Sequence, residues 1–361
     1  MKVMALSRRW FLASLPAACL AQSGKGRVLP SAITRYPDPA TEFPIARLTD
    51  PGCSSILSGP RAISKHGFLV CASDGSGRYE AYRIDLKNGQ QKQLTDAADL
   101  DPHSMTLTPD DRGLVYRDGP SLMLTNLSSL RAREIYRIPE GFTPGKGIGL
   151  SEDGIYATLI EKKESTFRVR LASMLKGTAE TLAEAEEEMS DPTPRPRRAS
   201  VLYRRAGGWW LANYDGKQNY RLRLADGGLG PALWGPDGRS IFYLSYPADP
   251  RKLHTLREFV PDSNEDSLVA ETSQFVGFGR NADASVFAGA SGSKASPYVL
   301  LLVRAVRREL TLCEHRSSDP SLVTPAFSPN SQRVFFGSDR HGKPAIYSLA
   351  VDKLVAETES M

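Results

Sequence analysis

The sequence repeats one unit along most of its length, and this repeat is the strongest constraint on its fold. Each unit has a short apolar strand, a turn of the Ser/Thr-Pro-Asp-Gly type, alternating apolar residues and a second turn, as in TPAFSPNSQRVFFGSDRHGKPAIYSLAVD from Thr324. The first turns lie 39 to 48 residues apart and begin at Ser64, Thr108, Ser151, Pro196, Gly235, Arg280 and Ser328. Units of this length hold four short antiparallel strands. The sequence therefore predicts an all-β fold, a seven-bladed β-propeller of four-stranded blades.

The segment ahead of the first unit predicts how the ring closes. Residues 45–49, IARLT, resemble the strand that ends each unit, such as KQLTD at 92–96. We expect this N-terminal strand to pair with the final blade, because pairing removes the exposed strand edges of an open ring. The predicted organisation is a signal peptide at 1–21, an N-terminal extension at 22–44 and a single propeller domain at 45–361.

Two stretches between the third and fourth units depart from the strand pattern. Residues 177–189 contain TAETLAEAEEE, which predicts a helix with a solvated acidic face. Residues 190–200, SDPTPRPRRAS, are rich in proline and arginine, which predicts a loop joining the two blades.

The N-terminus resembles a twin-arginine export signal. Arg8 and Arg9 in SRRWFLAS precede an apolar stretch, 10–21, that is shorter than the roughly 20 residues needed to span a bilayer. We therefore expect export by the twin-arginine route to the periplasm or the cell exterior, with no membrane span after signal removal. A basic tail and lipidation at Cys19 are the alternatives.

Charge and motif content exclude several classes of function. The net charge is +5, and removal of Lys2, Arg8 and Arg9 with the signal leaves 5 − 3 = +2, without the basic stripe expected of a nucleic-acid binder. The sequence has no GxSxG, P-loop, GxGxxG or HExxH motif to start a hydrolase, nucleotide-binding or zincin site. Cys53, Cys71 and Cys313 follow the signal, and this odd number allows at most one disulfide among them.

Several segments together resemble the oligogalacturonate lyase family. The repeat SPNSQRVFFGSDRHGKPAIYSL is similar to the WD40-like repeat of TolB-type propellers. The ordered run YPDPATEFPIARLTD, SDGSGRYEAYRIDLKNGQQKQLTD and LTPDDRGLVYRDGPSLMLTNL is similar to the N-terminal half of the lyases. The resemblance implies a seven-bladed propeller that cleaves short pectin fragments by β-elimination, a carbon–oxygen lyase activity, with a manganese ion in the central channel.

The positions that match the family's metal ligands carry other residues here. The family has a His-Pro-His-Pro run before the Phe-Ser-Pro turn of the last blade, where this sequence has Leu322 and Thr324. A family histidine three residues before the fifth-blade tryptophan is Pro231 here, ahead of Trp234. These side chains lack the imidazole nitrogens of such a site. The sequence therefore predicts no metal ligands and no cofactor, although manganese is expected for the family.

The remaining candidates are polar residues expected near the channel. His103, in DLDPHSMTLTPDD, is the candidate general base. Lys146, Arg195 and Arg197 are candidates for neutralising an anionic ligand, and Gln274 also falls just before a first turn. Trp210 offers a stacking surface for a sugar ring, while strand alternation places one of Trp209 and Trp210 in the core.

Three functions remain open on this basis, and whether the protein is an enzyme is undecided. The favoured one is an exported propeller that binds oligogalacturonate or another anionic saccharide, a degenerate lyase-like protein without the usual manganese site. The second is an active β-eliminating oligogalacturonate lyase in pectin breakdown. The third is a TolB-like scaffold that binds a protein partner. A fold alone does not choose among them.

Overall fold

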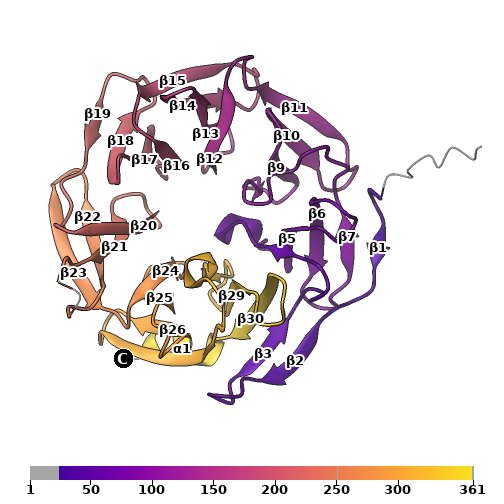
Figure 1. Cartoon of the computed structure of the whole chain (residues 1–361), viewed down its shortest axis with the longest axis vertical. Coiled ribbons are helices and arrows are strands. Elements are labelled where there is room, and N and C mark those ends of the chain that lie inside the picture. The colour runs from indigo at the N-terminus through magenta and orange to yellow at the C-terminus, as the bar shows by residue number, and fades with distance from the viewer. Residues whose placement is uncertain (1–23, 250, 360–361) are drawn as a thin grey trace, which may run out of the picture.

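The computed structural model describes residues 24–249 and 251–359, and it is an all-β protein with a β-propeller arrangement. The sheets stand around a common centre, and β12, β16, β20 and β24 lie nearest to it (Figure 1). The chain circles this centre once, and its last strands return to its first ones. Residues on the inner strands are therefore the ones that reach the middle of the ring.

Apart from β2 and β3, the strands from β1 to β19 form three sheets. One contains β1 (Val28–Leu29), β4 (Ser55–Ile56), β5 (Phe68–Ser73), β6 (Glu80–Asp85) and β7 (Gln91–Gln93). The next contains β8 (Thr106–Leu107), β9 (Gly113–Asp118), β10 (Ser121–Asn126) and β11 (Ala132–Arg137). The third contains β12 (Thr143–Leu150), β13 (Tyr156–Lys163), β14 (Thr166–Ser173), β15 (Ala179–Ala185), β16 (Met189–Pro194), β17 (Ser200–Arg205), β18 (Gly208–Asn213) and β19 (Asn219–Arg221).

Three further sheets complete the ring. Two have four strands each: β20 (Gly228–Trp234), β21 (Ile241–Tyr246), β22 (Thr255–Val260) and β23 (Glu265–Glu271), then β24 (Phe275–Arg280), β25 (Val286–Ser291), β26 (Tyr298–Val303) and β27 (Arg308–Glu314). The last combines β2 (Thr34–Pro37) and β3 (Pro44–Arg47) with β28 (Ala326–Phe327), β29 (Arg333–Ser338) and β30 (Ala345–Ala350). The helical elements are η1 (Pro60–Ala62), η2 (Pro320–Leu322) and α1 (Asp352–Glu359).

The prediction of seven four-stranded blades is wrong. The described strands form six hydrogen-bonded sheets, of which three have four strands, two have five and one has eight. The eight-stranded sheet arises because β12 and β16, the inner strands of two successive units, pair in parallel at Lys146 and Ser190. Gly147 and Gly149 on β12 allow this approach, since a Cβ on either would lie within 3 Å of backbone atoms of Asp191 or Pro192.

An N-terminal segment joins the first and last sheets. Residues Ile45, Ala46 and Arg47 of β3 pair antiparallel with Leu349, Ser348 and Tyr347 of β30. This is the pairing that the sequence predicts for residues 45–49. Ahead of it, β2 pairs with β3 and β1 pairs with β7, so part of the stretch 22–44 also lies in sheets.

A hydroxyl or amide side chain organises the first turn of several units. The hydroxyl oxygen of Thr108 accepts the backbone N–H of Gly113 at 2.8 Å, and that of Ser151 accepts the N–H of Tyr156 at 3.0 Å. The same i to i+5 contact recurs from Ser328 to Arg333 and from Asn281 to Val286, at 3.0 and 3.1 Å. This local hydrogen bond explains why the repeat places Ser, Thr or Asn at the start of the turn.

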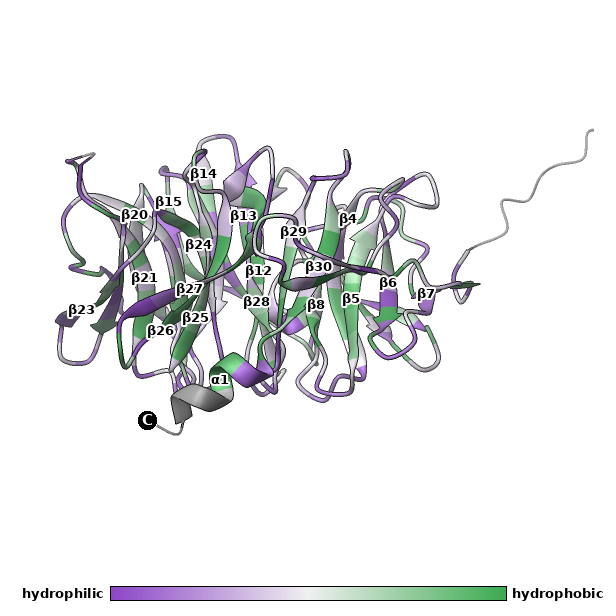
Figure 2. Ribbon diagram, turned by 90° about the horizontal axis from the view of Figure 1, so that it is seen from below, coloured by the Kyte–Doolittle hydropathy of each residue, from purple (hydrophilic) through white to green (hydrophobic). Residues whose placement is uncertain are grey.

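The core lies between neighbouring sheets. Figure 2 shows hydrophobic residues along the strands and hydrophilic residues mainly in the loops at the two faces. The fully buried side chains include Tyr347, Phe336 and Ile45 between the last sheet and β24–β27. Apolar burial between sheets is therefore the main stabilising term, as alternation in the sequence indicates.

Two local predictions are wrong. Residues 179–185, expected in a helix, form β15, because pairing with β14 and burial of Leu182 and Ala183 override helical propensity. Residues 189–194, expected mostly in a loop, form β16, where a bulge between Ser190 and Thr193 takes Pro192 out of the ladder.

Some predictions concern residues beyond this description. The signal peptide at 1–21 and its twin-arginine motif lie outside the described residues, so export and the choice of compartment stay predictions. Within 24–249 and 251–359, no helix is long and apolar enough to cross a membrane. Cys53, Cys71 and Cys313 are free thiols.

Candidate functional site

The structure connects two of the predicted site residues, His103 and Lys146, through a chain of polar contacts near the inner strands. The backbone N–H of His103 donates to Asp101 Oδ1 at 3.0 Å, and Asp101 Oδ2 forms an ion pair with Arg117. Arg117 in turn donates to the carbonyl oxygen of Gly145 at 2.7 Å. Lys146 follows directly in the chain, so the loop before β8 and the start of β12 form one polar neighbourhood.

Both of these side chains are exposed to solvent. Lys146 lies in a bulge of β12, opposite Ser190 of β16, and makes no ion pair with any residue of 24–249 or 251–359. His103 is in the turn before Ser104. The arrangement offers an unpaired ammonium and an accessible imidazole, which suit the binding of an anion and proton transfer.

Two half-buried arginines hold β12 in place, and neither is predicted from the sequence. Arg61 donates to the carbonyl oxygen of Leu150 at 2.5 Å, near the end of β12, while Arg117 holds the carbonyl of Gly145 near its start. Burial lowers the pKa of both guanidinium groups, which nevertheless remain cationic near neutral pH. The sequence signal that could have identified Arg117 is an arginine in an otherwise apolar strand segment, GLVYRD.

Arg195 and Arg197 do not join Lys146. The Arg195 side chain is 5% exposed, donates to Gly238 O at 2.6 Å and pairs with Asp262 at 3.2 Å. Its guanidinium also lies 5.1 Å from the centre of the Trp234 ring. The exposed Arg197 adopts a positive φ of 57° in the following turn. Arg195 follows β16 five residues after Ser190, the partner of Lys146, so about 16 Å of strand separates the two positions.

The other two predicted ligand-binding residues lie elsewhere in the ring. Gln274 is half-buried in the loop between β23 and β24, where its backbone carbonyl accepts the N–H of Gly292 at 2.8 Å. Trp210 is also half-buried, with the guanidinium carbon of Arg205 4.5 Å from its ring centre. Trp209 is 3% exposed, which confirms that one tryptophan of the pair is in the core.

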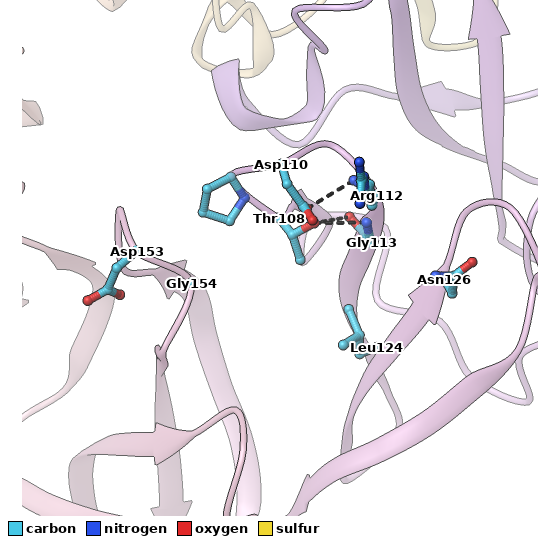
Figure 3. Close-up of a pocket in the computed structure, with 9 residues that line it drawn as sticks. Thr108, Asp110, Arg112, Gly113, Leu124, Asn126, Asp153 and Gly154 are labelled. Atoms are coloured by element: carbon cyan, nitrogen blue, oxygen red, sulfur yellow. Dashed lines mark hydrogen bonds between the residues drawn. The ribbon is translucent and has the colours of Figure 1, made fainter.

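Two surface cavities occur at turns between units, and neither is lined by a predicted site residue. The first, of about 400 Å³, lies between the turns at 108–113 and 153–154. Figure 3 shows Asp110 held by Thr108 and the backbone of Arg112, with Asp153 on the facing turn. The second, of about 490 Å³, lies between the turns at 63–67, 86–87 and 328–333.

The positions matched to the family's metal ligands do not fit a transition-metal ion. Leu322, in η2, is 61% exposed. Thr324, two residues later, is also exposed, and so is Pro231 on β20. Within the described parts of the chain, no three His, Cys, Asp or Glu residues are grouped to hold a metal ion. The residues present supply neither imidazole nor carboxylate at these positions.

One buried histidine gives the protein a pH-dependent stability. His315 is fully buried, with Nε2 2.9 Å from Ser291 O and Nδ1 accepting the N–H of Ser317 at 3.1 Å. Burial lowers its pKa below the ordinary value of 6.5. The unfolded chain therefore takes up a proton that the folded chain does not, and stability is lost as pH falls through about 6.5.

We expect replacement of His315 by glutamine to flatten this pH dependence. The measurement is the melting temperature at several pH values from 7.5 to 5.0, where the wild type falls more steeply than His315→Gln whatever their difference at pH 7.5. The exposed His66→Gln is the control and keeps the wild-type slope. Equal slopes in all three proteins would rule out His315 as the titrating group.

Two enzymes are similar to the chain over nearly its whole length. The oligogalacturonide lyase of Pectobacterium atrosepticum is 25% identical over 378 residues, which covers 90% of this chain and 97% of the relative. The oligogalacturonate lyase of Dickeya dadantii is 25% identical over 377 residues with the same coverage. No family model matches the chain. These relatives confirm the resemblance to the oligogalacturonate lyases.

Solved structures show the same fold. An oligogalacturonate lyase in complex with manganese superposes with a TM-score of 0.84 at 21% identity, covering 90% of this chain and 98% of the other. The enzyme from Vibrio parahaemolyticus gives 0.84 at 22% identity, with 91% and 98% covered. The β-propeller domain of Cps50 from Myceliophteria thermophila gives 0.60 at 13% identity, with 82% and 98% covered.

The manganese complex corrects one prediction. The sequence predicts no cofactor, and the similarity to a lyase solved with manganese contradicts that prediction. The chain's own residues at the matched positions, Leu322, Thr324 and Pro231, still do not fit the ion. Whether manganese affects this protein's binding or turnover is therefore a question for experiment.

Proposed function

From the premise that this chain resembles the oligogalacturonate lyases in sequence and fold, we propose that it binds oligogalacturonate or a closely similar anionic saccharide. The supporting observation is similarity to two such enzymes over 90% of the chain, together with the superposition on a lyase of that fold. An oligogalacturonate carries one carboxylate per sugar, so its recognition requires cations that are not already paired.

Lys146 is the residue that best meets this requirement. Its ammonium is exposed and makes no ion pair among residues 24–249 and 251–359, in contrast to Arg195, which Asp262 and Gly238 engage. Arg61 and Arg117 fix the strand that carries it, so the ammonium starts from an ordered backbone. In this proposal the ammonium of Lys146 donates a hydrogen bond to a uronate carboxylate and so lowers the free energy of the bound anion.

The connection of His103 to the same neighbourhood favours β-elimination as a second function. The imidazole of His103 would remove the proton from the carbon next to the uronate carboxylate. The electron pair forms the new double bond as the bond to the glycosidic oxygen breaks, and the leaving oxygen takes a proton from solvent. Lys146 would stabilise the charge that builds on the carboxylate.

A lysine substitution tests both functions together. We expect Lys146→Met to weaken oligogalacturonate binding about 10- to 100-fold, the loss typical of one charge-assisted hydrogen bond. Binding is measured by calorimetry, and turnover by the ultraviolet absorbance of the unsaturated product, each with added manganese and with chelator. Lys217→Met removes another exposed lysine, in the β18–β19 turn, and should bind as the wild type does.

The outcomes separate the functions. Binding without product supports a saccharide-binding protein, and product that requires His103 supports the lyase. Turnover that requires manganese would mean that residues other than Leu322, Thr324 and Pro231 coordinate the ion. Neither binding nor turnover under any condition would refute the proposal and leave a scaffold that binds another protein.

A further inference from the structure

The seam where the ring closes contains a cluster of buried and partly buried polar side chains, with one exposed histidine, that the proposed function does not use. The cluster consists of Tyr36, Asp38, Arg47, Arg340, His341 and Tyr347, here called the closure cluster. Tyr36, Asp38 and Arg47 come from the N-terminal strands and the loop between them, and the others come from the last unit. It faces β27, since Asp38 Oδ1 accepts the N–H of Glu314 at 3.4 Å and Arg340 donates to His315 O at 3.4 Å.

Contacts around Tyr347 show that the cluster converges on one place. Its hydroxyl lies 2.7 Å from His341 Nδ1, and the Arg340 guanidinium carbon is 5.1 Å from its ring centre. Arg47 is directly opposite Tyr347 across the β3–β30 pair. The Tyr36 and His341 rings meet edge to face with centres 6.2 Å apart.

Four buried atoms in this cluster have no hydrogen-bond partner within residues 24–249 and 251–359. Three are donors, namely Tyr36 Oη, Arg47 Nε and one terminal nitrogen of Arg340, and the fourth is the acceptor Asp38 Oδ2. The side chain of Arg340 is 4% exposed and that of Asp38 is 0% exposed, and their nearest charged atoms are 3.6 Å apart. Buried polar groups are normally satisfied by protein groups or by ordered water, so four orphans in one cluster indicate partners that the described residues do not supply.

The charges of the cluster leave a cation available. Among the surrounding acids, Glu314 pairs with Arg316 at 2.5 Å, and Asp339 accepts the N–H of Ser318 at 2.8 Å. Asp38 uses its Oδ1 for the backbone N–H groups of Ala40 and Thr41. Arg47 has no carboxylate within 4 Å among the described residues. Burial, then Arg47 and Arg340, lowers the pKa of His341, in keeping with a positive local potential.

We propose that the closure cluster is a binding site for inorganic phosphate. The three orphan donors match three acceptor oxygens of one tetrahedral anion, and arginine suits such oxygens. Near neutral pH this anion also carries at least one P–OH group, which donates to Asp38 Oδ2. Sulfate has no hydrogen to donate and would place an oxygen lone pair against that carboxylate. The site therefore distinguishes the two anions by one hydrogen bond.

Occupancy of this site would hold the two ends of the chain together. Phosphate would contact the N-terminal strands through Tyr36 and Arg47 and the last unit through Arg340. A ligand that binds only the folded ring stabilises it by mass action. The half-buried Tyr36 and the exposed His341 form the solvent side of the cluster, while Arg340 and Asp38 form its buried end.

The test compares anions at equal ionic strength. The full chain is melted at pH 7.5 in sodium phosphate, sodium sulfate or sodium chloride, and phosphate binding is measured by calorimetry. We expect phosphate to raise the melting temperature by several degrees over chloride and sulfate to raise it clearly less. A melting temperature that is the same in all three salts, or an equal rise in phosphate and sulfate, refutes the proposal.

A single hydroxyl supplies the second arm of the test. Tyr36→Phe removes one orphan donor without changing the ring contacts, so in chloride its melting temperature should equal or exceed that of the wild type. Its affinity for phosphate should fall about 10-fold. The exposed Tyr220→Phe is the control and keeps the wild-type response. Full phosphate affinity in Tyr36→Phe would overturn the site, as would a loss of stability in chloride, which would show that the hydroxyl already has a partner.

Discussion

Replacing Glu161 by glutamine is expected to lower the free energy of unfolding by about 3–5 kcal/mol, the cost typical of breaking a buried ion pair on one side. Glu161 on β13 is 0% exposed and accepts the hydroxyl of Tyr136 at 2.6 Å. It also pairs with Arg168, and the Nε of Arg170 lies 3.6 Å away. The neutral amide would leave two largely buried guanidinium groups without a charged partner.

Urea unfolding followed by tryptophan fluorescence measures this loss. Glu186→Gln is the matched control, because Glu186 is exposed and should change stability by less than about 0.5 kcal/mol. A loss below about 1 kcal/mol for Glu161→Gln would show that water or a rearranged arginine replaces the carboxylate.

A methyl group at Gly149 is expected to cost about 3 kcal/mol by forcing β12 away from β16. A Cβ there would lie 2.4 Å from Pro192 O and 2.4 Å from Pro194 Cδ, distances that require backbone movement. Because Lys146 is on the same strand, Gly149→Ala should also weaken oligogalacturonate binding. The same urea experiment measures the stability change.

Gly337→Ala provides the comparison for this substitution. Its Cβ would meet Leu322 O at 3.7 Å, an ordinary contact, so the variant should be as stable as the wild type. If the two alanine variants are equally stable, the approach of β12 to β16 is looser than the structure describes.

The repeat was sufficient to predict the propeller arrangement but not the division into sheets. A turn marked by Thr108 or Ser328 is a local feature, and its i to i+5 hydrogen bond can be inferred from a few residues. The eight-stranded sheet, by contrast, forms because β12 and β16, which belong to different units, pair with each other. The glycines of PGKGIG carried a signal of close approach, but only the folded ring shows which backbone they approach.

The candidate site was predictable only in part for the same reason. The neighbourhood of His103 and Lys146 depends on Arg117, whose partners Asp101 and Gly145 belong to different units. Arg195 is expected near the channel because it lies just before the first turn of its unit. Its ion pair with Asp262 joins residues 67 positions apart, a contact that no local pattern encodes.

The pairing of β3 with β30 has a consequence for the order in which the protein is made. Ile45 pairs with Leu349, so β3 can complete its pairing only after the much later strand β30 has been synthesised. On the ribosome, the edge of β3 stays without that partner until residues 345–350 have emerged. Such long-range contacts form late and slowly. Nascent chains that stop before β30 would therefore expose an open strand edge, and these truncated products should be the ones that need chaperones or proteases.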